Sequence, residues 1–418
     1  MLTPTLLLFG AVLLALTLAD RLVRRLPLSP AVIYLIVGLA AGALLGAPDA
    51  DTLIDRAAPV VVATEAAVLV SLLAVGLRLR VPPTLRAWRE ALLMAGPGMV
   101  VTIVLGAAAA MVLLGLPWPA ALLLGAIMAP TDPVLASEVQ TRHEADRDAV
   151  RLSLTAEGGL NDGSALPAVM LALGLLGLHT LGANGGAWLW NDLVWAIGGG
   201  ALIGVLAGWV LGLLLRWRIL KGDKLARDEL LYVGAVAFAF GLAKATSTST
   251  FVVMFAVGVT LLLPLRGDAV ADSAQALSKR LDDFGARIER LVEAATVLAV
   301  GLALNSVIPT WPMLAFGLVL VVLVRPLSVF AVVRRRTMAR HQRRLVAWFG
   351  IRGIGTLYYL AFAIEHGVQG PLAHTLVGAS LAAIAMSILL HGISATPLME
   401  SYQQRRRALP QGEQPPVP

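Results

Sequence analysis

The chain has 418 residues, of which 58% are hydrophobic and only 14% are charged, and its mean hydropathy is +0.81. A soluble domain carries about a quarter charged residues, so this composition indicates a polytopic membrane protein. The net charge of +7 does not indicate nucleic-acid binding, because the basic residues fall in connections between apolar stretches, where they act as orientation signals. The chain contains no cysteine, which excludes disulfides and thiolate metal sites.

About thirteen apolar stretches approach the roughly 20 residues that a spanning helix needs. The first has no basic residue before it, so we expect a retained helix and not a cleaved signal peptide. The eighth and ninth stretches are short, which makes them the weakest assignments. In chain order the stretches cover about 2–19, 29–45, 59–77, 91–114, 119–139, 150–176, 193–215, 230–245, 250–263, 291–308, 313–333, 345–363 and 372–397.

Basic residues concentrate in alternate connections, beginning with Arg21, Arg24 and Arg25 and ending with residues 405–407. The intervening connections, such as 49–55, are acidic or nearly uncharged. The positive-inside rule then places the N-terminus outside and the C-terminus in the cytoplasm, which requires an odd number of spans. We therefore expect a multi-pass protein of the cell inner membrane, surrounded by membrane lipid.

An odd number of spans also predicts internal symmetry. If one span links two groups of roughly six, the groups are inverted repeats, a common plan of secondary transporters. Spans five and twelve then correspond, and each contains helix-breaking residues: Pro-Thr-Asp-Pro at 130–133 and Gly-Ile-Arg-Gly-Ile-Gly at 350–355. Paired interruptions of this kind indicate a binding site at mid-membrane. The expected fold is all-α, with two inverted six-helix repeats and two discontinuous helices that cross.

Four acidic residues lie inside apolar stretches: Glu65, Asp132, Glu157 and Asp162. Placing an ionised carboxylate inside the membrane has a high free-energy cost, so such a residue indicates a functional site. Glu157 and Asn161 share one helix face at i, i+4, and Asp162 lies about 100° further round. The sixth span therefore presents polar groups to more than one neighbouring helix.

Hard oxygen ligands gather in spans five and six. Thr131 and Asp132 accompany Asn161 and Asp162, and such a set suits an alkali cation but has too few carboxylates for a calcium site. A buried carboxylate holds either a proton or a cation, and this competition couples the two fluxes. We therefore expect a transporter and not an enzyme, with no cofactor apart from the transported ions. The alternative role of Asp132 is a capping carboxylate.

Two arginines within the membrane, Arg325 and Arg352, also need partners. Glu157 is the candidate for Arg325, the alternative being that Glu157 is itself an ion ligand. Arg352 is expected to bind backbone carbonyls as a structural or gating residue, and His391 to be buried and hydrogen-bonded. Glu65 is either an ion ligand or the partner of a basic group.

Other functional classes make different demands on the sequence. An organic-anion symporter on a broken-helix fold needs a roomy site rich in hydroxyl and amide groups, which spans five and six do not offer. A membrane sensor needs an output domain, and an ATP-driven pump needs a phosphate-binding loop such as GxxxxGK[ST]. A K⁺/H⁺ antiporter of the same fold remains an alternative to exchange of Na⁺.

Four motifs carry a resemblance to a known family. They are APTDPV at 129–134, TAEGGLNDGSALP at 155–167, LVRPL at 323–327 and FGIRGIGTLYYL at 349–360. In order and spacing they resemble sodium/proton exchangers of the cation:proton antiporter-1 family, over about residues 1–400.

The resemblance implies electroneutral exchange of one Na⁺, or Li⁺ or K⁺, for one proton by an elevator-like movement. It implies that Asp162 binds the ion and the proton, and that Glu157 and Arg325 form a core ion pair. The chain has Gly158 where many members have serine, which leaves the choice between sodium and potassium open. The remaining residues implied at the ion site are Asn161, Thr131, Asp132 and Glu65, with Asp162, Asp132 and Thr131 as the ligands of the alkali cation.

The resemblance also implies a homodimer in which a core bundle moves against a dimerisation part. The tail after the membrane domain is rich in Gln, Arg and Pro, and we expect it to be disordered. The expected parts are a membrane domain at 1–402, comprising a core bundle at about 91–177 and 311–399, a dimerisation part at about 1–78 and 228–308 and a linker helix at about 187–216, followed by a tail at 403–418.

Overall fold

The computed structural model describes most of the chain beyond residue 27. The described ranges are 28–79, 84–136, 139–141, 148–222, 228–267, 270–333 and 338–407, together with scattered positions before residue 28. The first expected span, 2–19, therefore lies largely outside the described residues, as do residues 408–418 of the expected tail.

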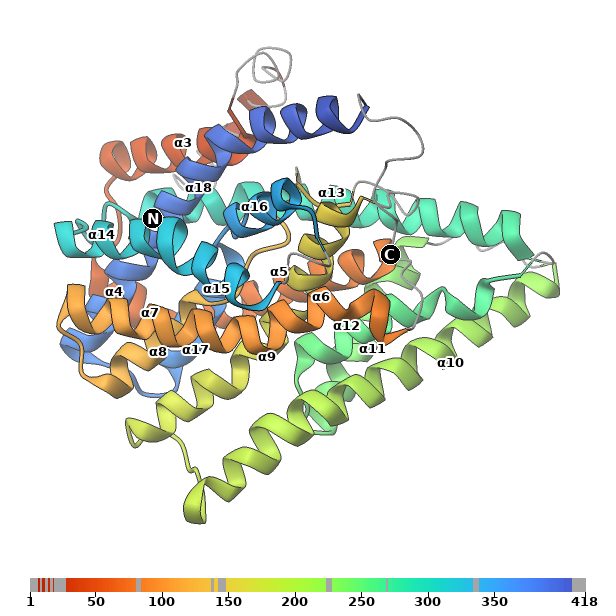
Figure 1. Cartoon of the computed structure of the whole chain (residues 1–418), viewed down its shortest axis with the longest axis horizontal. Helices are drawn as coiled ribbons and strands as arrows, with labels where there is room; N and C mark the ends of the chain where they lie inside the picture. The colour runs from red at the N-terminus through yellow and green to blue at the C-terminus, as the bar shows by residue number, and fades with distance from the viewer. Residues whose placement is uncertain are drawn as a thin grey trace.

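Every regular element in the described ranges is a helix (Figure 1). Three π-helical segments occur, namely η1 (Met94–Gly98) between α6 and α7, η3 (Trp188–Gly199) before α10 and η6 (Leu320–Val324) between α14 and α15. Two short 3₁₀ turns are η2 (Ala183–Gly185) and η4 (Leu263–Leu265). The α-helices are α3 (Pro30–Leu45), α4 (Ala50–Asp55), α5 (Ala57–Arg78), α6 (Leu85–Leu93), α7 (Met99–Leu114), α8 (Trp118–Met128), α9 (Ala149–Leu175), α10 (Gly200–Leu220), α11 (Asp228–Ala245), α12 (Thr250–Leu261), α13 (Ala271–Ala303), α14 (Trp311–Val319), α15 (Arg325–Val332), α16 (Arg340–Trp348), α17 (Ile354–Glu365) and α18 (Gly370–Arg407).

Five helical stretches in the described residues are long and apolar enough to cross a membrane. Other apolar helices are shorter, among them α3, α8, α12 and α17. The all-helical expectation is confirmed, whereas the number of thirteen spans stays a prediction. The five long stretches are Ala57–Arg78, Ala87–Leu114, Ala183–Leu220, Trp311–Val332 and Gly370–Arg406.

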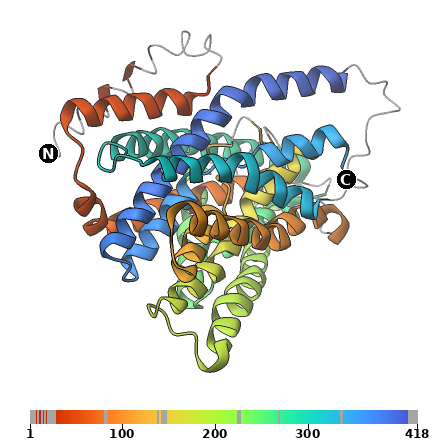
Figure 2. The ribbon, with the colours of Figure 1, turned by 60° about the vertical axis from the view of Figure 1, so that its left-hand side comes forward.

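Figures 1 and 2 show how the helices are arranged. Helices α7, α8 and α9 pack together, with α8 in contact with both of the others (Figure 1). In both views α3 and α18 lie at one end, and α10 lies at the opposite edge (Figure 2). Glycines at spacing i, i+4 on α10 allow close packing on α12: a Cβ on Gly204 would lie 2.5 Å from the carbonyl oxygen of Val253, and one on Gly208 would lie 2.8 Å from that of Val257.

Both expected interruptions are present. Helix α8 ends at Met128, and residues 129–132 lie outside any helix. Likewise α16 ends at Trp348, and α17 begins only at Ile354. The amide of Asp132 donates to the carbonyl of Ile351 at 2.8 Å, so the two non-helical segments contact one another. The crossing of two discontinuous helices, predicted from sequence, therefore occurs in the structure.

Span five is shorter than expected. We predicted it to continue to residue 139, but residues 133–136 form turns. Pro130 and Pro133 lack the N–H groups that a helix would use and disfavour helical geometry at the residues before them. The helix therefore does not resume within residues 133–136.

Two helices are longer than predicted. Helix α13 begins at Ala271, about 20 residues before the apolar stretch, because its first half is amphipathic and carries charges that a hydropathy criterion rejects. Helix α18 continues to Arg407, so residues 403–407 are helical and the expectation of disorder is wrong for them. The end of α18 is held by Asp148, whose Oδ2 accepts hydrogen bonds at 2.8 Å from both the Tyr402 hydroxyl and Arg406 Nη1.

Candidate functional site

Asp162 lies in the middle of α9 and is 1% exposed. Neither of its carboxylate oxygens has a hydrogen-bond partner among the residues that the structure describes. The adjacent Asn161 is also 1% exposed, and its Nδ2 donates to the hydroxyl of Thr131 at 2.6 Å. This bond leaves Asn161 Oδ1 without a partner in the described part of the chain. Two neighbouring side chains thus offer buried, free oxygen atoms, which is the chemistry of a cation or proton site.

The start of α17 faces this carboxylate. A Cβ at Gly355 would collide with Asp162 Oδ1, so the backbone of α17 approaches the carboxylate as closely as glycine allows. The hydroxyl of Tyr359 donates to the backbone carbonyl of Asp162 and ties α17 to α9. The hydroxyl of Thr356, in the first turn of α17, is buried and has no partner among the described residues. Gly355 was predicted only as a helix-breaking residue, and neither Thr356 nor Tyr359 was predicted at the site.

Asp132 has a different environment, although it lies at the same crossing. Its Oδ1 accepts hydrogen bonds from the amides of Val134 at 2.8 Å and Leu135 at 3.3 Å. Its Oδ2 accepts from the amide of Ile354, the first residue of α17. The carboxylate therefore supplies acceptors to the non-helical segment and to the N-terminus of α17, where N–H groups lack helical partners. These are the contacts of a capping carboxylate, and the role of Asp132 as an ion ligand stays a prediction.

Glu157 and Arg325 form a buried ion pair, with side chains 4% and 5% exposed respectively. Arg325 Nη1 donates to Glu157 Oε1, and Nη2 donates to Oε2 at 2.8 Å. Nη2 also donates to the carbonyls of Val346 at 3.1 Å and Phe349 at 2.9 Å. The pair expected from the sequence is thus present, and it joins α9 to α15 and to the end of α16. A Cβ at Gly350 would lie 2.7 Å from Arg325 Nε, so glycine makes room for the guanidinium.

Arg352 and His391 both form hydrogen bonds with backbone carbonyls in or next to the second interruption. Arg352 is 2% exposed, and its Nη1 donates to the carbonyl of Gly350 at 3.1 Å. The amide of Arg352 donates to the hydroxyl of Ser387 at 3.0 Å. His391 is buried, with Nδ1 2.7 Å from the carbonyl of Ser387 and Nε2 2.9 Å from that of Trp348. The contacts of both side chains match the structural roles expected for them.

Glu65 does not contact Asp162 in the described structure; it is paired elsewhere. Glu65 lies on α5 and is 7% exposed. Its Oε1 accepts a hydrogen bond from the hydroxyl of Thr250 at 3.0 Å and lies 3.2 Å from Lys244 Nζ. The expectation that Glu65 partners a basic group is therefore met, but the sequence did not identify Lys244, which lies at the end of α11, 179 positions away (244 − 65).

A second buried charge cluster joins α5 to α13. Arg78, the last residue of α5, is 9% exposed. Its Nε donates to Asp282 at 2.6 Å and its Nη2 donates to Glu289 at 2.5 Å. The two carboxylates lie on the charged part of α13 that precedes its apolar stretch, so the ion pairs fasten this part of the helix to the end of α5.

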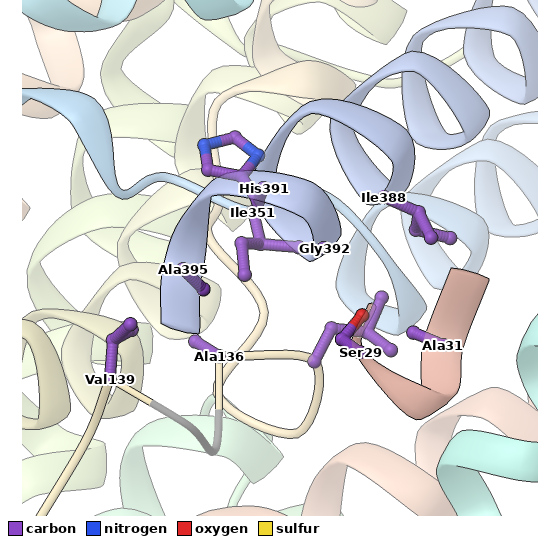
Figure 3. A pocket seen from close by; sticks show the side chains of 10 residues that line it. Ser29, Ala31, Ala136, Val139, Ile351, Ile388, His391, Gly392 and Ala395 are labelled. Carbon is purple, nitrogen blue, oxygen red and sulfur yellow. The ribbon is translucent and has the colours of Figure 1, made fainter. Parts of the chain in front are cut away.

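A narrow, mostly apolar pocket lies behind the crossing (Figure 3). Its walls come from the start of α3, from the segment that follows the first interruption and from α18. Ile351 of the second interruption also borders it. The other lining residues are Ser29, Ala31, Leu135, Ala136, Val139, Ile388, His391, Gly392 and Ala395.

A helical bundle with two crossing interruptions and a free carboxylate beside them is the architecture of a secondary transporter. Comparison with known families agrees, since residues 10–401 match the family described as "Sodium/hydrogen exchanger, transmembrane". The chain therefore belongs to this family of integral membrane proteins.

Individual relatives are distant. The K(+)/H(+) antiporter NhaP2 of Shewanella oneidensis is 25% identical over 395 residues, covering 93% of this chain and 65% of the relative. The K(+)/H(+) antiporter NhaP of Alkalimonas amylolytica is 26% identical over 407 residues, covering 94% of this chain and 66% of the relative. The Na(+)/H(+) antiporter 2 of Zygosaccharomyces rouxii is 38% identical over 101 residues, 23% of this chain and 12% of the relative. This chain thus spans about two thirds of the length of the bacterial relatives.

Solved structures show the same fold. The sodium proton antiporter MjNhaP1 of Methanocaldococcus jannaschii at pH 8 has a TM-score of 0.67 at 20% identity, covering 94% of this chain and 99% of that chain. A structure of MjNhaP1 from electron microscopy has a TM-score of 0.73 at 20% identity and covers both chains fully.

Proposed function

We propose that this protein is a secondary transporter that exchanges a monovalent cation for a proton. The observation that carries the proposal is the Asp162 carboxylate, which is buried, has no partner within the described structure and lies beside the free Oδ1 of Asn161. A carboxylate retained at this depth without a partner indicates transport chemistry. Gly355 lacks the methyl group that would collide with Asp162 Oδ1, and the nearby Asp132 is held by the amide of Ile354, so Asp162 is the carboxylate at the crossing that remains free for an ion.

The coupling between cation flux and proton flux follows from the charge of the Asp162 carboxylate. The ionised Asp162 carboxylate binds a cation, the protonated one does not, and either occupant makes the site neutral. Asn161 cannot titrate and Asp132 is held by backbone amides, so in this proposal the single free carboxylate of Asp162 exchanges one cation for one proton without net charge movement. The exchange needs no cofactor and no covalent chemistry.

Alternating access then requires the crossing to face each side of the membrane in turn. In this proposal the core bundle of α7–α9 and α14–α18 moves as an elevator against a dimerisation part that contains α3–α5 and α11–α13. The protein works as a homodimer in the cell inner membrane, with its N-terminus outside and its C-terminus in the cytoplasm.

Sodium is the leading cation and potassium the second candidate. Sodium leads because the matching family is described as a sodium/hydrogen exchanger, and potassium is supported by the two bacterial relatives, which are named K(+)/H(+) antiporters. Gly158 also supplies no side-chain oxygen to a ligand shell, which weakens the case for a small, strongly hydrated ion. Li⁺ is expected to follow Na⁺.

The test is cation-driven proton flux in proteoliposomes that contain a pH-sensitive dye, with Na⁺, K⁺ and Li⁺ added in turn. Asp162→Asn should abolish the flux, whereas Asp51→Asn, which alters a carboxylate with a 78% exposed side chain, should leave it unchanged. The apparent KM for the cation should rise as pH falls, because protons and cations compete for Asp162. Full activity of Asp162→Asn, or a rate that responds to a clamped membrane potential, would contradict the proposal.

A further inference from the structure

The contact between Lys244 and Glu65 joins a solvent-accessible charge to a buried one. The Lys244 side chain is 55% exposed, whereas the Glu65 side chain is 10% exposed. Lys244 is the second-last residue of α11 and precedes the polar turn Thr246-Ser247-Thr248-Ser249. Its ammonium therefore reaches from the surface at this turn to Glu65 Oε1, 3.2 Å away.

Contacts continue from Glu65 towards the ion site. Thr250, which donates to Glu65, is the first residue of α12, and the next residue is Phe251. The Phe251 ring packs edge-on against Tyr359, with centroids 6.1 Å apart. Tyr359 in turn donates its hydroxyl to the backbone carbonyl of Asp162. Glu65 and Asp162 are thus connected through the aromatic contact between Phe251 and Tyr359.

We propose that Lys244 is a tethered competing cation at Glu65, and that it sets the apparent affinity for the transported ion on the side of the membrane that the α11–α12 turn faces. This inference rests on the proposed exchange. The ammonium carries the same single charge as an alkali cation and lies against the carboxylate and hydroxyl oxygens that such a cation prefers. Lys244 is already more than half exposed, so it moves into water at small cost when an arriving cation displaces it.

A purely structural ion pair makes a different prediction. If the pair only fastened α11 to α5, loss of Lys244 would lower stability and leave the apparent KM unchanged. If Lys244 competes, its loss lowers the apparent KM for the cation and leaves kcat unchanged. The two readings therefore separate in the kinetics.

The test compares Lys244→Gln with the wild type in proteoliposomes, adding the cation to each side in turn. The apparent KM should fall about fivefold on one side only, since an ion pair whose lysine is exposed is worth up to ~1 kcal/mol. Lys244→Arg keeps the charge and should keep the wild-type KM. Lys221→Gln removes an exposed lysine that lies over the Trp217 ring at the end of α10 and should change nothing. In Glu65→Gln the apparent KM should no longer depend on residue 244.

A second readout does not depend on transport. The cation concentration that gives half of the maximal thermal stabilisation should be about fivefold lower for Lys244→Gln than for the wild type. An unchanged or higher value in both readouts, or an equal effect on both sides, overturns the role of Lys244. Absence of cation-driven proton flux in the wild type overturns the proposed function instead, and the thermal shift still reports on competition at Glu65.

Discussion

Replacing Arg325 by methionine is expected to destabilise the folded protein by about 3–5 kcal/mol, the range for removing one partner of a buried ion pair. The structure predicts that the loss of unfolding free energy for Arg325→Met lies near the upper end of this range. Glu157 would remain 4% exposed with its negative charge uncompensated, and the carbonyls of Val346 and Phe349 would each lose a donor, at about 1 kcal/mol apiece. The free energy of unfolding is measured by SDS titration of the purified protein in mixed micelles.

The double variant Arg325→Met/Glu157→Leu should recover most of that loss, because apolar replacement of both partners removes the buried charge altogether. The control is Arg280→Met, in which the arginine side chain is 48% exposed and lies 2.9 Å from Asp228. Its expected cost is below about 1 kcal/mol. If Arg325→Met costs no more than this control, or if the double variant is no more stable than the single one, the pair does not hold the core together as inferred.

Two further predictions concern the start of α17 and the N-terminus of α9. Gly355→Ala places a methyl group against the Asp162 carboxylate and should reduce cation-driven proton flux by about 100-fold or more, because a small displacement of a reacting group is enough to disable a site. The control is Gly241→Ala, which adds a methyl group where there is open space and should keep the wild-type rate. Asp148→Ala removes the cap of α9 and the acceptor of the Tyr402 hydroxyl, so it should lower the free energy of unfolding by about 1–3 kcal/mol. It should also increase amide hydrogen exchange at the end of α18, and unchanged exchange there would contradict the role of Asp148 as an anchor.

The sequence by itself determined the class of protein and the positions of the two interruptions. Composition identifies a membrane protein because water and lipid select side chains along the whole chain. Pro130 and Pro133, and the glycines of residues 350–355, break helices through local backbone effects that neighbouring sequence is enough to reveal. The pairing of Glu157 with Arg325 was also predictable, since few opposite charges lie deep enough in apolar stretches to neutralise one another.

Only the tertiary structure decided how the remaining polar groups are used. Asp132 and Asp162 both lie in apolar stretches of the sequence. In the structure Ile354, 222 positions after Asp132, supplies the amide that occupies one of the Asp132 oxygens, while Asp162 keeps both oxygens free of partners among the described residues. Glu65 likewise meets Lys244 only because α5 packs beside the end of α11. Hydropathy along the sequence indicates how deep a charged side chain lies in the membrane. Which side chain pairs with it depends on which helices pack together. That packing depends on contacts between distant parts of the chain.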